Sequence, residues 1–468
     1  MAISLLQPMH RLRAANRVWG LLEVLTCFIV SRLVFAHLGV HFDATGLDRY
    51  WQFLPTELLR TDLLRSLWYL HAQPPLFNAF LGVGVQLFGD PAAFFHGAFL
   101  ALSLAMHLAL FRILIALAVP RPWVVAALVL FSLNPSLATH ENWLFYALWE
   151  AGLLLLAALA LAQFRVAHRP GALWLWSGAV TVLMLARAAF HPLWLLLVVA
   201  LYALSRWRKR QPLDRRVLRA ILLPLLLVLL WMAKNQLLCG DFSTSSWLGM
   251  NLARATVTAL PDPLLETAIA KGDLTPFARI GPFRPLKEYG ALLPPQPPTG
   301  IPALDGDNFN NLQYVRVAHA LRQDSLYFIG HFPGDYLTRV GDGARIYLET
   351  TNHNAQLHDN REKLAPLEDA YNLVLRPGDS ALPMLLAVLL ALVAGLHALL
   401  ARTVTVPLAR DDLLAAFLTG TVLWVTLAGT LLEYGENNRF RFAIDPLLLV
   451  LLLQAAGQFR KPIDPAQP

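Results

Sequence analysis

Residues 206–232 read RWRKRQPLDRRVLRAILLPLLLVLLWM, and this stretch sets how the rest of the chain is interpreted. Seven basic residues fall between positions 206 and 219, and a nearly unbroken apolar run follows them. Lysine and arginine concentrate in the cytoplasmic loops of membrane proteins, beside the apolar helices that cross the bilayer. The stretch therefore predicts a cytoplasmic loop at 206–219 and a membrane-spanning helix around residues 222–232.

The composition of the whole chain agrees with a membrane protein. Hydrophobic residues make up 56% of the 468 positions and charged residues only 15%, whereas soluble domains carry about a quarter charged residues. The net charge of +7 could indicate nucleic acid, but the basic residues gather between apolar runs, so we expect no nucleic-acid partner. Cys27 and Cys239 form neither a disulfide framework nor a zinc-ligand spacing.

The apolar runs predict an all-α polytopic membrane protein with about ten transmembrane helices, since each crossing needs about 20 apolar residues. The first run shows no clear signal-peptide cleavage site, so we expect it to be retained. With the N-terminus in the cytoplasm, the predicted spans are residues 18–40, 93–119, 123–138, 144–164, 173–186, 192–204, 222–232, 382–400, 413–432 and 447–456.

Residues 76–88 leave two interpretations open, because this apolar run is short for a crossing. It is either a full span or a short half-inserted helix that returns to the same side. The half-inserted helix is favoured because it places the basic loop at 206–219 inside, whereas a full span would reverse most of the loops. The resulting domains are an N-terminal transmembrane module at 1–236 with its first outer loop at 41–92, an extracytoplasmic segment at 237–380, and C-terminal transmembrane helices at 381–468.

Acidic residues lie at span ends that this topology places outside. Asp43 and Asp48 follow the first span, and Glu141 stands alone between two apolar runs. A carboxylate in such a place could act as a general base toward an acceptor hydroxyl. It could also be a solvated loop acid or a cap at the start of a helix.

Other outer residues could bind an anionic group. His71 and Gln73 come just before a Pro-Pro pair that suits the first turn of a helix, so they could donate to an anion there or simply mark a helix entry. Arg187 and His191 close another outer end, where an arginine either binds phosphate or snorkels at the interface. The last outer loop is a dense polar cluster that could clamp phosphate or sugar, or only form ion pairs, and includes Glu436, Arg439 and Arg441.

In their order and common sidedness, these stretches resemble the GT-C superfamily of membrane glycosyltransferases. That superfamily includes protein O-mannosyltransferases, lipid A aminoarabinose transferases and oligosaccharyltransferase catalytic subunits. Its pattern has an acid soon after the first span, a His-Pro-Pro-Leu-like entry to a short helix, an acid in the second outer loop, and a Glu…Arg…Pro segment before a late span. The matching positions here are Asp43, residues 71–76, Glu141 and residues 436–446, with the departure that the helix entry reads His-Ala-Gln-Pro-Pro.

The resemblance implies an inverting glycosyltransferase of the cytoplasmic (inner) membrane, with its active site facing the periplasm or exterior. The donor would be a polyprenyl-phosphate-linked sugar, and the acceptor a hydroxyl of a glycan, lipid or protein. Asp43 would be the general base, with Glu141 and Asp48 as further catalytic candidates. The implied substrate-binding residues are His71, Gln73, Arg187, His191, Glu436, Arg439 and Arg441.

No metal site is expected, because the second outer loop holds one acid where metal-using members of the superfamily carry more. A divalent metal is used by some members, and the sequence does not indicate one here. Two alternatives come from other classes of protein. A lipid or solute transporter or flippase should show internal repeats and interrupted spans, and a structural or assembly protein would have no reason to gather acids and arginines on one side.

Overall fold

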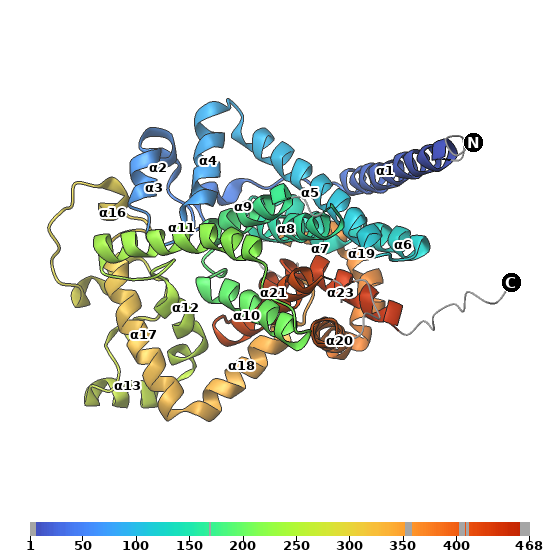
Figure 1. Cartoon of the computed structure of the whole chain (residues 1–468). Helices are drawn as coiled ribbons and strands as arrows, with labels where there is room; N and C mark the ends of the chain where they lie inside the picture. The colour runs from blue at the N-terminus through green and yellow to red at the C-terminus, as the bar shows by residue number, and fades with distance from the viewer. Residues whose placement is uncertain (1–5, 168–169, 352–357, 402–407, 409–410, 459–468) are drawn as a thin grey trace.

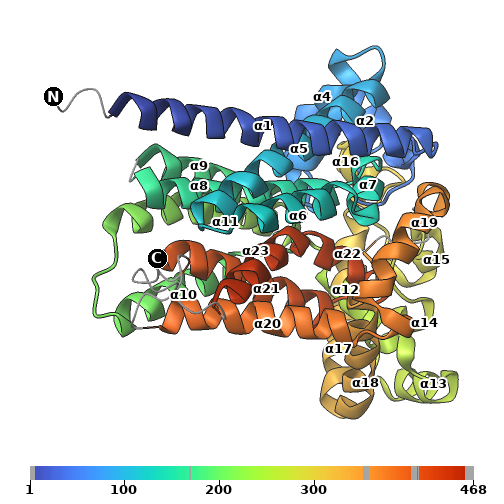
Figure 2. The same ribbon diagram turned by 90° about the vertical axis from the view of Figure 1, so that its right-hand side faces the viewer.

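The structure is a computed structural model that describes residues 6–167, 170–351, 358–401, 408 and 411–458. Within these residues every regular element is a helix, apart from one isolated bridge between Asp43 and Trp143. Figure 2 shows a bundle of helices with further helices gathered at one end. Residues 41–75, 240–351, 358–381 and 432–444 lie at one end, which we call the loop end, and we keep for them the name outer segments from the predicted topology. The opposite end, with the turn at 209–214, is the hairpin end.

Within the described residues, six helices are long and apolar enough to cross a membrane. They are α1 (Leu6–His37), α5 (Pro91–Ala116), α8 (Ala147–Ala167), α11 (Arg215–Cys239), α20 (Leu382–Leu400) and α21 (Asp412–Leu431). A bent pair, α6 (Arg121–Ser132) and α7 (Pro135–Glu141), makes a seventh if its halves are taken as one span broken by 52°. The prediction of an all-helical chain with long apolar helices is confirmed, whereas the number of about ten spans is not.

The other predicted spans fall on shorter helices. α9 (Pro170–Ala186) and α10 (Pro192–Arg208) have 17 residues each, and α23 (Asp445–Gln458) has 14. At about 1.5 Å per residue, none of them reaches the roughly 30 Å of a hydrocarbon core. They nevertheless belong to the bundle, because α9 packs on α8, α10 on α21 and α23 on α20.

Helix α4 (Pro75–Leu87) forms where the sequence predicts the short helix. Pro75 occupies its first turn, where no backbone donor is needed. Its 13 residues are about 20 Å long, less than the hydrocarbon core. Figure 2 shows α4 at the loop end of the bundle, and half-insertion stays our prediction for it.

The chain between α11 and α20 forms a helical layer over the loop end (Figures 1 and 2). Its helices are α12 (Leu248–Ala255), α13 (Asp262–Lys271), α14 (Phe277–Ile280), α15 (Leu286–Tyr289), α16 (Pro302–Asp305), α17 (Gln313–His331), α18 (Pro333–Tyr347) and α19 (His358–Leu375). This layer has an apolar core of its own, in which Trp247, Tyr289 and Phe328 are buried. Ala72 of the first outer loop joins the same core, so the two outer segments pack as one layer.

Short helices complete the loop end. α2 (Thr56–Thr61) and α3 (Leu63–Trp68) lie in the first outer loop, and α22 (Asn437–Phe442) lies between α21 and α23. Both α2 and α3 pack against α4, while α22 packs against α18 and α21. This arrangement brings the first, middle and last outer segments of the chain together.

Candidate functional site

A cavity of about 460 Å³ lies at the loop end, where the outer segments meet. Its lining comes from the first outer loop, the start of α8, the end of α9, α12, the loop after α14, and the segment from Glu433 to Phe440. Its charged lining consists of Arg49, Arg187, Arg254, Arg439, Glu433 and Glu436. With Glu150 of α8, which pairs with Arg187, the four arginines meet three carboxylates, and the remaining positive charge favours an anionic ligand.

Arg439 on α22 is one of two buried cations in this cavity. Its Nη2 lies 2.6 Å from a Glu436 oxygen, and its Nη1 donates to the Tyr146 hydroxyl at 3.1 Å. Its buried Nε has no hydrogen-bond partner in the described part of the chain. Burial alone would lower the pKa of Arg439, but Glu436 and the Tyr146 hydroxyl raise it above its ordinary value, so this side chain stays charged.

Arg187, just after α9, is the second buried cation. Its Nε lies 3.0 Å from a Glu150 oxygen on α8. Its guanidinium carbon is 4.1 Å from the centre of the Tyr146 ring and 5.2 Å from that of Phe440. Tyr146 therefore contacts both cations, with Arg187 over its ring face and Arg439 at its hydroxyl.

A third arginine joins the middle segment to the last outer loop. Arg254 on α12 donates from Nη1 to Glu433 at 2.8 Å. Burial raises the pKa of Glu433, and the Arg254 charge opposes that rise. Gly435 adopts φ +100°, and a Cβ there would lie 2.9 Å from Nη2 of Arg254, so a glycine lets the loop pass close to this arginine.

Aromatic residues form one wall of the cavity. The Trp51 ring stacks on Phe283, with centroids 5.3 Å apart, and on Phe309 at 4.9 Å. Trp247 meets Phe283 edge to face at 5.2 Å. Trp51, Trp247 and Phe283 line the cavity, so an apolar ring face is available beside the cations.

The segment before α4 presents Gln73 to the cavity. The Gln73 side chain is 7% exposed, lines the cavity, and makes no hydrogen bond within the part of the chain that the structure describes. The neighbouring backbone is held by Lys234, which donates to Leu70 O at 2.7 Å, and by Asn310, whose Oδ1 accepts from His71 N at 2.8 Å. Gln73 is thus a buried amide on a fixed backbone, available to a ligand.

His71 supports this segment and does not line the cavity. Its Nδ1 lies 2.8 Å from the Ser246 hydroxyl, and its Nε2 lies 2.8 Å from the Asn310 carbonyl oxygen. Burial lowers the pKa of His71 to about 4. The ring is therefore neutral at neutral pH with both nitrogens occupied. The prediction that Arg187, Arg439 and His71 share one cavity is right for the arginines and wrong for His71.

Asp43 lines a second, smaller cavity of about 190 Å³, together with His41, Thr45, Asn142 and Asp359 among others. Its backbone is bridged to the start of the α8 segment, since Asp43 N donates to Asn142 O at 2.8 Å and Leu144 N donates to Asp43 O at 2.9 Å. Its carboxylate accepts from Thr45 N at 2.8 Å. No basic side chain pairs with this carboxylate in the described residues.

Tyr50 and Trp143 lie between the two cavities. Trp143 lines the smaller cavity and Tyr50 the larger one, and the Trp143 indole nitrogen donates to the Tyr50 hydroxyl at 2.7 Å. Burial raises the pKa of Tyr50, the Trp143 bond opposes this, and the Asp43 charge adds to it. The Trp143–Tyr50 hydrogen bond thus joins the wall of the Asp43 cavity to the wall of the larger cavity, which we call the cation cavity.

Glu141, at the end of α7, lines neither of these two cavities. It is 1% exposed and forms an ion pair with Arg32 of α1 through both of its oxygens. Arg32 also donates to the Ser103 hydroxyl at 2.9 Å. This arrangement ties α1, α5 and α7 together, which assigns Glu141 a packing role in addition to the catalytic role that the sequence predicts.

Three more predicted site residues point elsewhere. The exposed Asp48 accepts from Thr56 N at 3.1 Å. His191 caps α10 by accepting from Leu193 N at 3.3 Å. Arg441 donates to Tyr347 O at 2.6 Å and to Asp445 at 3.2 Å. None of the three is among the residues lining the cation cavity.

Several residues that line the cavity were not identified from the sequence. Arg254, Trp247 and Phe283 lie in the middle segment, whose sequence resembles nothing in the GT-C pattern, so no local signal marked them. Tyr146 stood out in the sequence only as the last residue of the segment 134–146, which contains Glu141. Among the described residues, no three His, Cys, Asp or Glu side chains are placed to hold a metal ion.

Comparison of the chain with known protein families, curated proteins and solved structures finds no match. The cavity and the chemistry of its lining therefore carry the functional proposal.

Proposed function

We propose that the chain is an inverting membrane glycosyltransferase that uses a polyprenyl-phosphate-linked sugar. The observation that carries the proposal is the pair of buried arginines, Arg187 and Arg439, that both contact Tyr146 in a cavity with an aromatic wall. Arginine matches the geometry of a phosphate better than other cations do. A cavity at one end of an apolar bundle suits a ligand whose tail lies in lipid.

The donor phosphate would bind between the two arginines. Fixed cations in a buried site stabilise the negative charge that grows on the departing phosphate, and such interactions are worth more there than in water. This accounts for the excess of arginine over carboxylate in the cavity.

The sugar would lie against Trp51, Trp247 and Phe283. A sugar ring offers C–H groups on its face and hydroxyls at its edge, so it needs an apolar surface beside polar partners. The Gln73 amide, buried and unpaired in the described structure, supplies both a donor and an acceptor for a hydroxyl.

The acceptor would enter from the smaller cavity, with Asp43 as the general base. The acceptor oxygen bonds to the anomeric carbon as the bond from that carbon to the phosphate oxygen breaks. Asp43 takes the acceptor proton, and polyprenyl phosphate leaves with the electron pair. Asp43 suits this task because its carboxylate has no basic partner among the described residues, whereas Glu433 and Glu436 are each paired with an arginine.

A lipid transporter or flippase is the second candidate, and the bend of 52° between α6 and α7 favours it. Broken helices at a substrate site are a feature of transporters. The second half of this bent pair, α7, ends at Glu141, which is buried in the bundle and paired with Arg32. Only one such pair occurs in the described part of the chain, whereas transporters built from repeats have two in corresponding positions.

The test uses the full chain in lipid vesicles supplied with polyprenyl phosphates that carry a radiolabelled hexose or pentose. We expect label to leave the lipid, and Arg439→Gln and Arg187→Gln to slow its release by about 100-fold or more, as for the loss of one fixed charge-stabilising group. Arg316→Gln, at an exposed position on α17, is the matched control. Movement of intact labelled lipid between leaflets, without sugar release, would instead identify a transporter.

A further inference from the structure

The turn between α10 and α11 concentrates positive charge at the hairpin end of the bundle. Seven lysines and arginines lie between residues 206 and 219, with a single acidic residue, Asp214, among them. Three of these basic residues form ion pairs with carboxylates, and we call them the inner group. The other four, which we call the outer group, form no ion pair with a carboxylate of the described residues.

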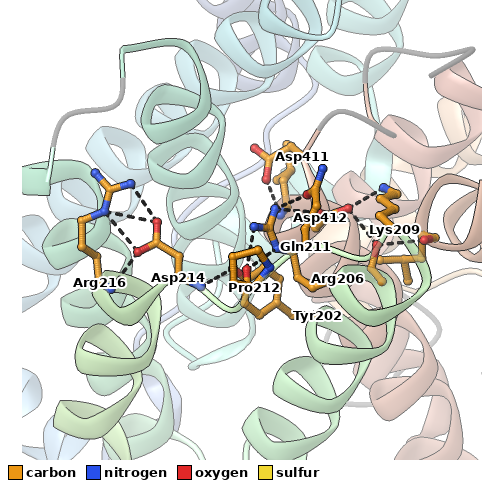
Figure 3. Close-up of polar contacts among 12 residues, drawn as sticks. Tyr202, Arg206, Lys209, Gln211, Pro212, Asp214, Arg216, Asp411 and Asp412 are labelled. Carbon is orange, nitrogen blue, oxygen red and sulfur yellow. Dashed lines mark hydrogen bonds and ion pairs between the residues drawn. The ribbon is translucent and has the colours of Figure 1, made fainter. Parts of the chain in front are cut away.

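The inner group holds the hairpin to the start of α21 (Figure 3). Asp412 is 8% exposed and forms ion pairs with Lys209 and with Arg206, the latter at 3.4 Å. Ser205 donates to the same carboxylate at 2.7 Å. Arg216 lies apart from these and pairs with Asp214 at 2.8 Å. Asp412 and Asp214 thus pair with three of the seven basic residues.

The outer group consists of Arg208, Arg210, Arg215 and Arg219. All four are exposed, and none has a carboxylate partner within the described residues. Four guanidinium groups without a carboxylate partner, all between residues 208 and 219, repel one another. An external anion would relieve this repulsion.

Two of these arginines continue an exposed apolar stripe on α11. Arg215, Arg219, Leu222, Leu226 and Leu230 follow one another at spacings of three or four residues, which places them on one face of the helix. The three leucines are 63%, 57% and 56% exposed. This face is therefore cationic at its end and apolar along its length.

The end of α10 repeats the same arrangement. Leu204, Trp207 and Arg208 share a face, and the Trp207 side chain is 72% exposed. Tryptophan is enriched where the hydrocarbon of a bilayer meets its headgroups. Both helices of the hairpin thus present an apolar stripe that ends in an unpaired arginine.

We propose that this hairpin is a binding site for anionic glycerophospholipids. The headgroup phosphate binds the outer arginines, and the acyl chains lie along the leucine stripes of α11 and α10. Charge complementarity selects lipids with a net negative headgroup, and each basic residue near such a surface contributes about 1 kcal/mol. The site is independent of the proposed glycosyl transfer, since it lies at the opposite end of the bundle from the cation cavity.

The excess of basic residues also orients a membrane protein, and lysine fills this role as well as arginine does. Phosphate binding needs more, because the guanidinium fork can donate two hydrogen bonds to one phosphate and the lysine ammonium acts as a point charge. Replacing the outer arginines by lysine therefore separates the two roles.

The experiment measures quenching of Trp207 fluorescence by lipids brominated on their acyl chains. The full chain is placed in phosphatidylcholine vesicles with increasing brominated phosphatidylglycerol or, in parallel, brominated phosphatidylcholine. The difference between the protein and Trp207→Phe isolates the signal of this residue from the other tryptophans. We expect half-maximal quenching at a mole fraction about tenfold lower for phosphatidylglycerol, because the outer arginines attract its net negative headgroup.

The triple variant R208Q/R215Q/R219Q should lose this preference, and R208K/R215K/R219K should keep the orientation of the chain with a preference reduced severalfold. The variant K271Q/R316Q/R345Q, which makes the same charge change at exposed positions of the loop end, should behave as the unaltered protein. Equal quenching by the two lipids, or a preference that survives the glutamine variant, would overturn the proposal. So would displacement of phosphatidylglycerol by millimolar inorganic phosphate alone, because the ligand would then be a free anion.

Discussion

The Arg439 guanidinium donates a hydrogen bond to the Tyr146 hydroxyl at 3.1 Å, across most of the length of the chain. Arg187 lies over the face of the same ring, 4.1 Å from its centre. Tyr146 therefore holds two buried cations in fixed positions without neutralising either of them. This relationship positions the two buried arginines of the cavity.

Tyr146→Phe should weaken binding of polyprenyl phosphate by about three- to tenfold, since it removes one hydrogen bond worth about 1 kcal/mol. The phenyl ring keeps its contact with Arg187, so the fold should survive. Equilibrium binding of polyprenyl phosphate in nanodiscs measures the effect. Tyr69→Phe is the control, because the Tyr69 hydroxyl makes no hydrogen bond in the described structure. Equal affinities for the two variants would exclude a role for Tyr146 in placing Arg439.

Glu141→Gln should destabilise the protein by about 3–5 kcal/mol, because it leaves the Arg32 charge in the bundle without its partner. Thermal unfolding in detergent, followed by circular dichroism, gives the change. The double variant R32Q/E141Q should recover much of the loss, since no charge is then left unpaired.

This pair of variants also distinguishes packing from catalysis at Glu141. If the residue acts only through Arg32, activity should return in R32Q/E141Q together with stability. An inactive but stable double variant would restore the catalytic role predicted from the sequence.

Gly435→Ala should cost about 1–3 kcal/mol, because alanine is strained at φ +100°. The added Cβ also meets the end of Arg254, so the Arg254–Glu433 pair should be disturbed and donor affinity should fall. Gly341→Ala, at an exposed helical position with no atom near the new Cβ, should be neutral or slightly stabilising. Melting temperatures of the two variants, measured under the same conditions, test whether only Gly435→Ala loses stability.

Asp43→Asn should keep the fold and donor binding but slow transfer by about 100-fold or more, as expected for loss of a general base. The asparagine oxygen can still accept from Thr45 N, which preserves the local turn. Asp48→Asn should be milder, because Asp48 is exposed and bonded to Thr56 N. Near-normal transfer by Asp43→Asn would contradict the assignment, and a complete loss only in Asp48→Asn would move the role there.

Stability should fall as the pH drops below about 6.5. Burial lowers the pKa of His71 from 6.5 to about 4 in the folded chain, so between these values the unfolded chain binds a proton that the folded chain does not. The free energy of unfolding therefore rises with pH across this window and levels off above it. His71→Gln should flatten the slope between pH 4.5 and 6.5, which unfolding measurements in detergent at several pH values can detect. An unchanged slope would show that His71 is not the group responsible.

The helical character of the chain and the positions of its main apolar helices could be predicted from the sequence. Long runs such as 93–119, 144–164 and 413–432 correspond to α5, α8 and α21, because lipid requires apolar side chains and internally paired backbone groups over a continuous stretch. The basic turn at 206–219 was equally visible. Where prediction overcounted, the helices were apolar but short, as in α9 and α23.

The candidate site could be predicted only in part. Arg187 and Arg439 were expected in one cavity and both line it, and Gln73 and Glu436, which were named as binding candidates, line it too, because each stands out as a polar residue beside an apolar run. His71 and Arg441 stand out in the same way, yet they support the surrounding backbone. A sequence pattern records residue type and position, and it does not record which way a side chain points.

The sequence by itself determined that this is a chain of apolar helices with a cluster of positive charge on one turn and polar residues at the span ends. Those properties depend on the local solvent preference of successive residues. Only the tertiary structure decided that Arg439 meets Tyr146, that Glu141 is held by Arg32, and that Asp43 lies in a separate cavity. These pairings join residues that are far apart along the chain, so they depend on how the helices pack and on which buried charges find a partner there.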